Sequence, residues 1–279
     1  ISADKTIGSL RFAQDQNGNA KAYNIEFQGG AKLAVVGPGG FSMLRDAKVP
    51  LAAQTMDLKL AGAGSLIVSN NSANFANLID GQLNATLDMR DLDSFYAQVN
   101  RLPLGDYRAY PNFFTNGWAG GGTGNEVSRF APLIYLAKTN VIKAAYVDPN
   151  NYDDLGERNY ALTIGNYSQQ GTTANLRFSL GNSNAFFLDS ICFSQALQGG
   201  SGHNYNFWTS NSSALFRGMG GPNSRMSVFA IADAASPAPP GNANNRGQVN
   251  FANQANTTVD ALVDRLWLGV DRTNNNGQM

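Results

Sequence analysis

The feature that most constrains the fold is a period-two alternation of apolar and polar residues in short runs. In the run 82–88, for example, Leu83, Ala85 and Leu87 alternate with polar residues. Successive side chains of a strand point to opposite faces, so this pattern predicts half-buried strands. Runs of the same kind lie at 9–13, 22–27, 31–36, 55–60, 65–68, 83–89, 160–164, 173–180, 185–192, 226–232, 248–251 and 259–270.

Glycine-rich turns separate many of these runs, at 17–19, 28–30, 37–40 and 62–64. Glycine accepts the positive φ angles that tight hairpins need. Antiparallel sheets with one solvated face give a clean alternation of this kind, so the sequence predicts a mainly β, antiparallel protein. Strands and helices do not alternate regularly, and a doubly wound α/β fold is therefore not expected.

One segment departs from the alternation and predicts a helix over 91–102. Asp91 is a suitable N-cap, apolar residues follow with helical spacing at positions 92, 95, 96, 99 and 102, and Pro103 ends the segment. The most apolar stretch, 131–147, fits either a short helix or two buried strands.

The polar turn at 148–154 is the predicted domain boundary. A chain of 279 residues is long enough for two domains, each with its own core. We expect an N-terminal domain, 1–147, that includes the helix, and a C-terminal domain, 148–279, that ends in a polar tail. Each is expected to be an antiparallel β-sandwich of jelly-roll type, with a single large sandwich as the alternative.

The charge composition excludes several classes of protein. The chain has 20 basic and 20 acidic residues, and its polar surface is supplied largely by 33 Asn and 13 Gln. A net charge of zero argues against a basic nucleic-acid-binding surface. One Cys and one His form neither an intramolecular disulfide nor the usual zinc site. No run reaches the roughly 20 apolar residues of a membrane span, and no secretion signal is recognisable at the start, so we expect neither.

No set of residues with catalytic spacing stands out. His203 is the only histidine and lies in a glycine-rich segment that does little to hold a base in place. Cys192 lies in an alternating run, as a small buried residue would. Asp88, Asp91 and Asp93 are explained by the start of the predicted helix. We therefore expect no enzyme, and no catalytic, cofactor-binding or metal-binding residues.

Two weaker binding signals have equally good structural explanations. Oxygen ligands for Ca²⁺ are available in the segment 148–157, but their spacing departs from that of an EF-hand, and a solvated turn explains the segment as well. The candidate ligands are Asp148, Asn150, Asp153, Asp154 and Glu157. The glycine runs 37–40 and 120–124 lack the Lys-Ser/Thr ending of a phosphate-binding loop.

A neutral, amide-rich surface favours association between copies of the chain. We therefore expect a structural, self-assembling protein: a viral capsid subunit built from jelly-roll domains, forming a trimer or larger shell in the virion. The alternative is a secreted or cell-surface lectin or adhesin module, and a polysaccharide-cleaving enzyme is a third possibility without an identifiable acid/base pair. Sugar-binding aromatic residues for the alternative would be Tyr107, Tyr110 and Trp118, or Tyr205, Phe207 and Trp208.

Overall fold

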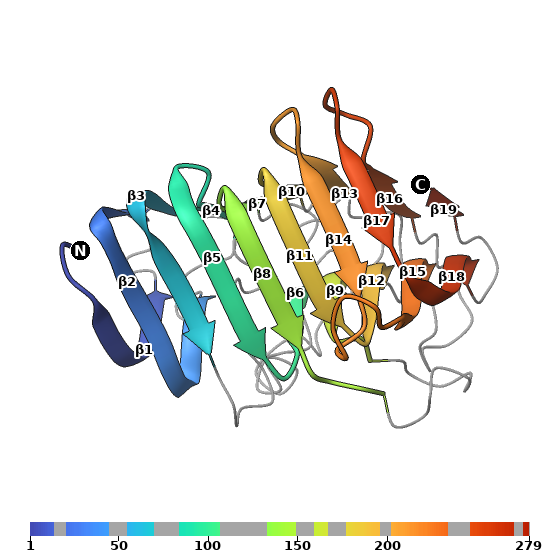
Figure 1. Ribbon diagram of the computed structural model, residues 1–279, viewed down its shortest axis with the longest axis horizontal. Coiled ribbons are helices and arrows are strands. Elements are labelled where there is room, and N and C mark those ends of the chain that lie inside the picture. Colours follow the sequence, from blue (N-terminus) through green and yellow to red (C-terminus); the bar gives the residue numbers. More distant parts are fainter. Residues whose placement is uncertain are drawn as a thin grey trace, which may run out of the picture.

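The structure is a computed structural model, and the part of the chain that it describes consists mainly of parallel β-strands (Figure 1). Every strand pairing among the described residues is parallel. The prediction of a mainly β protein is confirmed, but the prediction of antiparallel, jelly-roll β-sandwiches is wrong. The described residues are 1–13, 21–44, 55–69, 84–106, 133–148, 159–166, 177–195, 202–233, 246–270 and 276–278.

From residue 84 onward the chain winds in successive coils, and each full coil contributes one strand to each of three faces. The first face contains β4 (Asn84–Asp88), β7 (Leu133–Tyr135), β10 (Arg177–Leu180), β13 (Gly202–Phe207), β16 (Arg246–Asn250) and β19 (Asn276–Gln278). The second face contains β5 (Leu92–Val99), β8 (Thr139–Ala144), β11 (Ser183–Leu188), β14 (Ser213–Arg217) and β17 (Thr258–Ala261). The third face contains β6 (Leu102–Asp106), β9 (Leu162–Asn166), β12 (Ser190–Gln195), β15 (Met226–Asp233) and β18 (Val263–Val270).

The first three strands belong to the same winding but run through its corners. They are β1 (Lys5–Ala13), β2 (Lys21–Leu44) and β3 (Thr55–Ser69). One part of β3 pairs with β4 of the first face and the other with β5 of the second, so the first two faces form one large, strongly curled sheet. The third face is a separate five-stranded sheet. This architecture is a parallel β-solenoid, and its two chain ends lie at opposite ends of the row of coils (Figure 1).

The connections between faces differ in length. Those from the first face to the second are short in every coil, and the longest of them is 251–257, between β16 and β17. The connections from the third face back to the first include the longest, 107–132. The connections from the second face to the third also differ widely, from Leu262 alone between β17 and β18 to the residues 145–161 between β8 and β9. Length variation between coils is therefore found at the two corners that flank the third face.

Side chains that point inward stack on their counterparts in the next coil, which forms continuous inward rows. Paired aromatic rings lie nearly parallel: the centroids of Phe178 and Tyr205 are 5.2 Å apart, and those of Phe186 and Phe216 are 4.9 Å apart. Burial of these rows removes apolar surface from water in every coil and stabilises the stack. One such row, buried throughout, runs along the first face through Leu58, Leu87, Ile134, Phe178, Tyr205 and Val249.

Of the glycine turns that predicted hairpins, 17–19 lies outside the described residues, and 28–30, 37–40 and 62–64 lie at corners of the winding. Gly29 and Gly30 have φ angles of 63° and 79°, and Gly62 has a φ angle of 99°. The positive φ expected at these positions is therefore present. However, the strand segments on either side of each turn do not pair with one another; they pair with the coils above and below.

The predicted helix over 91–102 is wrong, because residues Leu92–Val99 form the strand β5. Phe95, Ala97 and Val99 are buried and point inward at every second position. Tyr96, which contributed to the helical spacing, is half-buried and donates a hydrogen bond to Gln98 at 2.7 Å. The stretch 131–147, for which two strands were one expectation, contains β7 and β8.

The domain boundary at 147/148 stays a prediction. Strand β8, before it, pairs with β11, after it, over six residue positions from Thr139 with Ser183 to Ala144 with Leu188. The described residues contain no helix that is long and apolar enough to span a membrane.

One buried tyrosine predicts an unusual mutational effect. Tyr205 is fully buried, its hydroxyl has no hydrogen-bond partner among the described residues, and burial raises its pKa well above the ordinary value. Tyr205→Phe removes the unpaired hydroxyl and keeps the stacked ring, so we expect the free energy of unfolding to rise by about 1 kcal/mol in urea denaturation.

Tyr160→Phe is the matched control for this prediction. Tyr160 is equally buried, but its hydroxyl donates to the carboxylate of Asp233. The same chemical change at this position breaks a buried hydrogen bond and is expected to destabilise the protein by about 1–3 kcal/mol. Equal losses in the two variants would contradict the assignment of Tyr205 as unpaired.

Candidate functional site

A groove with a mainly apolar lining lies at the C-terminal end of the solenoid. It has a volume of about 580 Å³ and lies where β16, β17 and β18 form the last complete coil. No described strand covers the outer edges of β17 and β18. The groove is lined by Phe229, Val249, Asn250, Phe251, Ala252, Thr257, Val259, Ala261, Val263 and Leu266.

The inward rows of the core end at this groove. On the third face, Phe229 pairs with Leu266 and Ile231 pairs with Leu268. The side chains of Phe229 and Ile231 are buried, whereas Leu266 and Leu268 are 48% and 49% exposed. Val259, at the end of a second-face row, is 38% exposed. The same positions that form the core in earlier coils thus present an apolar surface in the last one.

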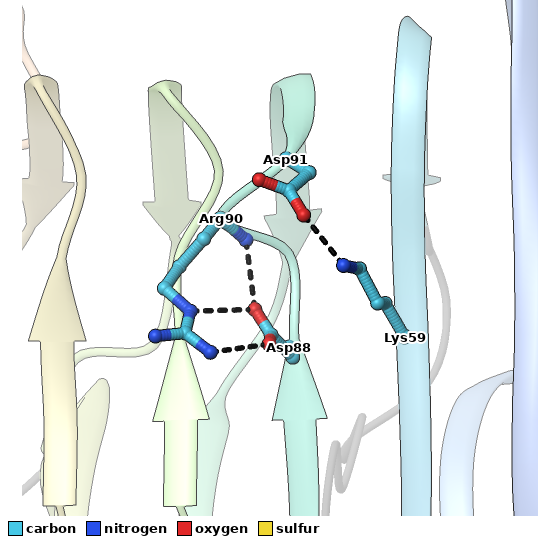
Figure 2. Close-up of polar contacts among 4 residues, drawn as sticks. All are labelled: Lys59, Asp88, Arg90 and Asp91. Carbon is cyan, nitrogen blue, oxygen red and sulfur yellow. Dashed lines mark hydrogen bonds and ion pairs between the residues drawn. The ribbon is translucent and has the colours of Figure 1, made fainter.

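A cluster of charged residues lies elsewhere, at the corner between β4 and β5 (Figure 2). The carboxylate of Asp88 accepts hydrogen bonds from the Nε and Nη2 atoms of Arg90 at 3.0 and 2.7 Å, and from the backbone N–H of Arg90 at 3.1 Å. Lys59, from the preceding coil, lies 2.6 Å from a carboxylate oxygen of Asp91. In the following coil, Lys138 pairs with Asp93 at 2.8 Å.

These contacts give the three aspartates a structural role. Burial tends to raise the pKa of Asp88, but the hydrogen bonds from Arg90 outweigh burial and hold it below the ordinary value. Asp88 therefore stabilises the fold above the ordinary carboxylate pKa, and this contribution is lost as the pH falls through the lowered pKa. The predicted reasons for these residues, capping for Asp91 and a favourable interaction with the helix N-terminus for Asp88 and Asp93, are wrong. The three aspartates pair with cations of their own and neighbouring coils.

Buried asparagines join the coils at the corner between the first and second faces. The Nδ2 atom of Asn140 donates to Oδ1 of Asn184 at 2.9 Å, and both side chains are 2% exposed. The Asn140 side chain also accepts a hydrogen bond from the N–H of Ala137 and donates one to its carbonyl. Asn184 makes the same two hydrogen bonds with Gly181. Asn184 further donates to the carbonyl of Ser213 in the next coil, at 2.8 Å. This asparagine ladder satisfies buried backbone groups and is a structural feature.

A small apolar cluster covers part of the outer side of the third face. It contains Tyr160, Cys192, Val228 and Ala230, with Trp267 packed against it. Cys192 is fully buried and lies in β12, in agreement with the expectation of a small buried residue. The sequence did not reveal this cluster. Its apolar residues lie on the outward side of the strands, and in an alternating pattern they cannot be distinguished from residues that face the core.

The remaining candidates from the sequence do not come together into a site. His203 lies in β13, paired with Gly247 of β16. Asp148 is buried, and its carboxylate accepts the backbone N–H of Asn159 at 2.7 Å. The other candidate calcium ligands, in 150–157, and the glycine run 120–124 lie outside the described residues. Within the described part of the chain, no three His, Cys, Asp or Glu side chains are grouped so that they could hold a metal ion.

The aromatic residues considered for sugar binding are largely unsuitable where they are described. Tyr205 and Phe207 are completely buried in the core, and the indole nitrogen of the half-buried Trp208 is also buried. Tyr107, Tyr110 and Trp118 lie outside the described residues.

Comparison of the chain with protein-family models, curated proteins and solved structures finds no match. The class that the geometry defines is therefore architectural: a parallel β-solenoid with an open apolar end.

Proposed function

We propose that this protein is a structural, self-assembling protein whose coils associate end to end. The observation that carries the proposal is the open groove at β16–β18, which exposed Val259 and Leu266 line. Exposed Leu268 extends this apolar surface two residues further along β18. An exposed edge of a parallel sheet carries unpaired N–H and C=O groups, which bind another strand readily. Both the hydrogen bonds and the apolar contacts that stabilise each coil are thus available to a further coil.

The proposal keeps the self-assembly expected from the neutral, amide-rich composition and changes its geometry. A jelly-roll shell would use the flat sides of sandwiches, whereas the described strands form a parallel solenoid. Stacking of coils favours linear assemblies, because an interface between unlike ends forms an open chain unless its rotation closes a ring. The virion, or alternatively the cell exterior, stays a prediction for the location of the assembly.

Charge introduced at the open end is expected to weaken self-association. In the double variant Leu266→Lys/Leu268→Lys, two cations replace the apolar side chains that would be buried by the next coil. Burial of one such side chain contributes about 1.5–3 kcal/mol, so the dissociation constant should rise at least about tenfold. Sedimentation or light scattering over a concentration series measures this change.

Val147→Lys is the matched control, because Val147 is 53% exposed and lies outside the groove. It should leave self-association unchanged while adding the same kind of charge. A wild-type protein that remains monomeric at high micromolar concentration would overturn the proposal.

A further inference from the structure

The opposite end of the solenoid has the features of a partner for this groove. At the N-terminal end, β1 pairs only with β2 among the described strands, so its other edge is open. The apolar side chains Ile7, Leu10, Tyr23 and Ile25 are only partly buried there, in contrast to the sealed middle of the core. Resting on the proposed function, we infer that the groove of one copy receives the β1 end of a second copy.

The two ends fit because the same inward row reaches both of them. On the second face one row begins at Ile7 and ends at Ala261, and it is in register throughout. A second copy placed with Ile7 next to Ala261 continues the row with the same strand direction. The row comprises Ile7, Val35, Val68, Ala97, Ile142, Phe186, Phe216 and Ala261.

The two ends are also complementary in shape, because at each end the three faces do not stop at the same coil. At the C-terminal end, the first face extends one strand further than the other two, because β19 stacks on β16. At the N-terminal end, β1 pairs with two later parts of β2, which begin at Leu33 and at Gly40. The earlier part of β2, 21–25, belongs to the first face, and its outer edge is open among the described strands. A second copy in this position would place β1 along β17 and β18, and β19 along the first-face part of β2.

Charge and side-chain order support the same pairing. The strand β1 carries Lys5 and Arg11 and no acidic residue, whereas β17 and β18 together carry Asp260, Asp264 and Arg265. The two edge strands thus differ in the sign of their own net charge, which favours contact between unlike ends. Asp260 and Asp264 also pair with Arg217 and Arg225 at 2.6 and 3.8 Å, so the order of the apolar side chains is the stronger of the two observations. On the third face, Leu10 and Phe12 repeat the spacing of Leu266 and Leu268.

Disulfide crosslinking distinguishes this inference from other modes of assembly. Thr6 and Asp260 directly precede Ile7 and Ala261 and lie at the two ends of the neighbouring outward row. Thr6 pairs with Ala34 at one end of that row, and Asp260 pairs with Leu215 at the other. A second copy that continues the row therefore places its Thr6 opposite Asp260 of the first copy. The double variant Thr6→Cys/Asp260→Cys, oxidised mildly, is expected to give covalent dimers and higher multimers. Each single variant is expected to stay uncrosslinked. The native Cys192 is buried and serves as the wild-type background.

Asp260→Cys alone also controls for loss of the ion pair between Asp260 and Arg217, and its thermal unfolding verifies that the variant folds. Covalent dimers from either single variant show contact between like ends and would overturn the inference. So would oligomers of the double variant that contain no disulfide. In both cases the proposed function survives, whereas monomeric wild-type protein overturns the proposed function and this inference together.

Discussion

Substitution of Asn184 by alanine is expected to lower the free energy of unfolding by about 3 kcal/mol or more. The side chain of Asn184 bonds to Asn140, to the N–H and carbonyl of Gly181, and to the carbonyl of Ser213, all within 3.0 Å. Alanine leaves these groups buried without partners, at a cost of about 1–3 kcal/mol each before relaxation. Urea denaturation monitored by circular dichroism measures the change.

Asn182→Ala is the control for this prediction, because Asn182 lies in the same corner with its side chain exposed. Its effect is expected to stay within about 0.5 kcal/mol. Asn184→Asp tests the two donors of the amide separately, since a carboxylate cannot donate to the carbonyls of Gly181 and Ser213. A loss below about 1 kcal/mol for Asn184→Ala would show that the asparagine ladder is not a main source of stability.

Gly62→Ala is the second substitution with a large expected effect. Gly62 has a φ angle of 99°, and a Cβ atom added there would lie 2.1 Å from the carbonyl oxygen of Phe27 in the preceding coil. The conformation alone costs an alanine about 1–2 kcal/mol, and the overlap with backbone forces neighbouring coils apart. We expect a loss of at least about 3 kcal/mol, or failure to fold, measured by thermal and urea unfolding.

Gly29→Ala separates the two causes. Gly29 has a φ angle of 63°, but an added Cβ there meets no atom within 4 Å. This variant should lose only the conformational part, about 1–2 kcal/mol. Similar losses in the two variants would mean that the coils move apart easily at Gly62.

The sequence predicts the strands well but not how they pair. The run 55–60 lies in β3, and residues 84–88 of the run 83–89 form β4, because alternation depends on having one buried face. Alternation has the same period in parallel and antiparallel sheets, so it contains no information on strand direction. The corner glycines, such as Gly62, have the positive φ of hairpin residues, and they were therefore interpreted as hairpins.

The candidate groove could not be predicted for a related reason. Leu266 and Leu268 have the same alternating pattern as Ile191 and Phe193, which are buried in the core. Only their position in the last complete coil makes them exposed, and coil number follows from the winding of the whole chain. Likewise, Asn140 and Asn184 are two among many asparagines, and their contact depends on the pairing of β8 with β11.

The unequal lengths of the connections between faces have a consequence for how such a chain can change during evolution. Strand register is defined by the short corners from the first face to the second, where Asn140 and Asn184 join successive coils. The connections from the third face to the first range from 107–132 to 271–275 without disturbing that register. The connections from the second face to the third range likewise from Leu262 alone to 145–161. Insertions and deletions are therefore expected at the two corners that flank the third face, while point substitutions at the corner between the first and second faces are under strong structural constraint.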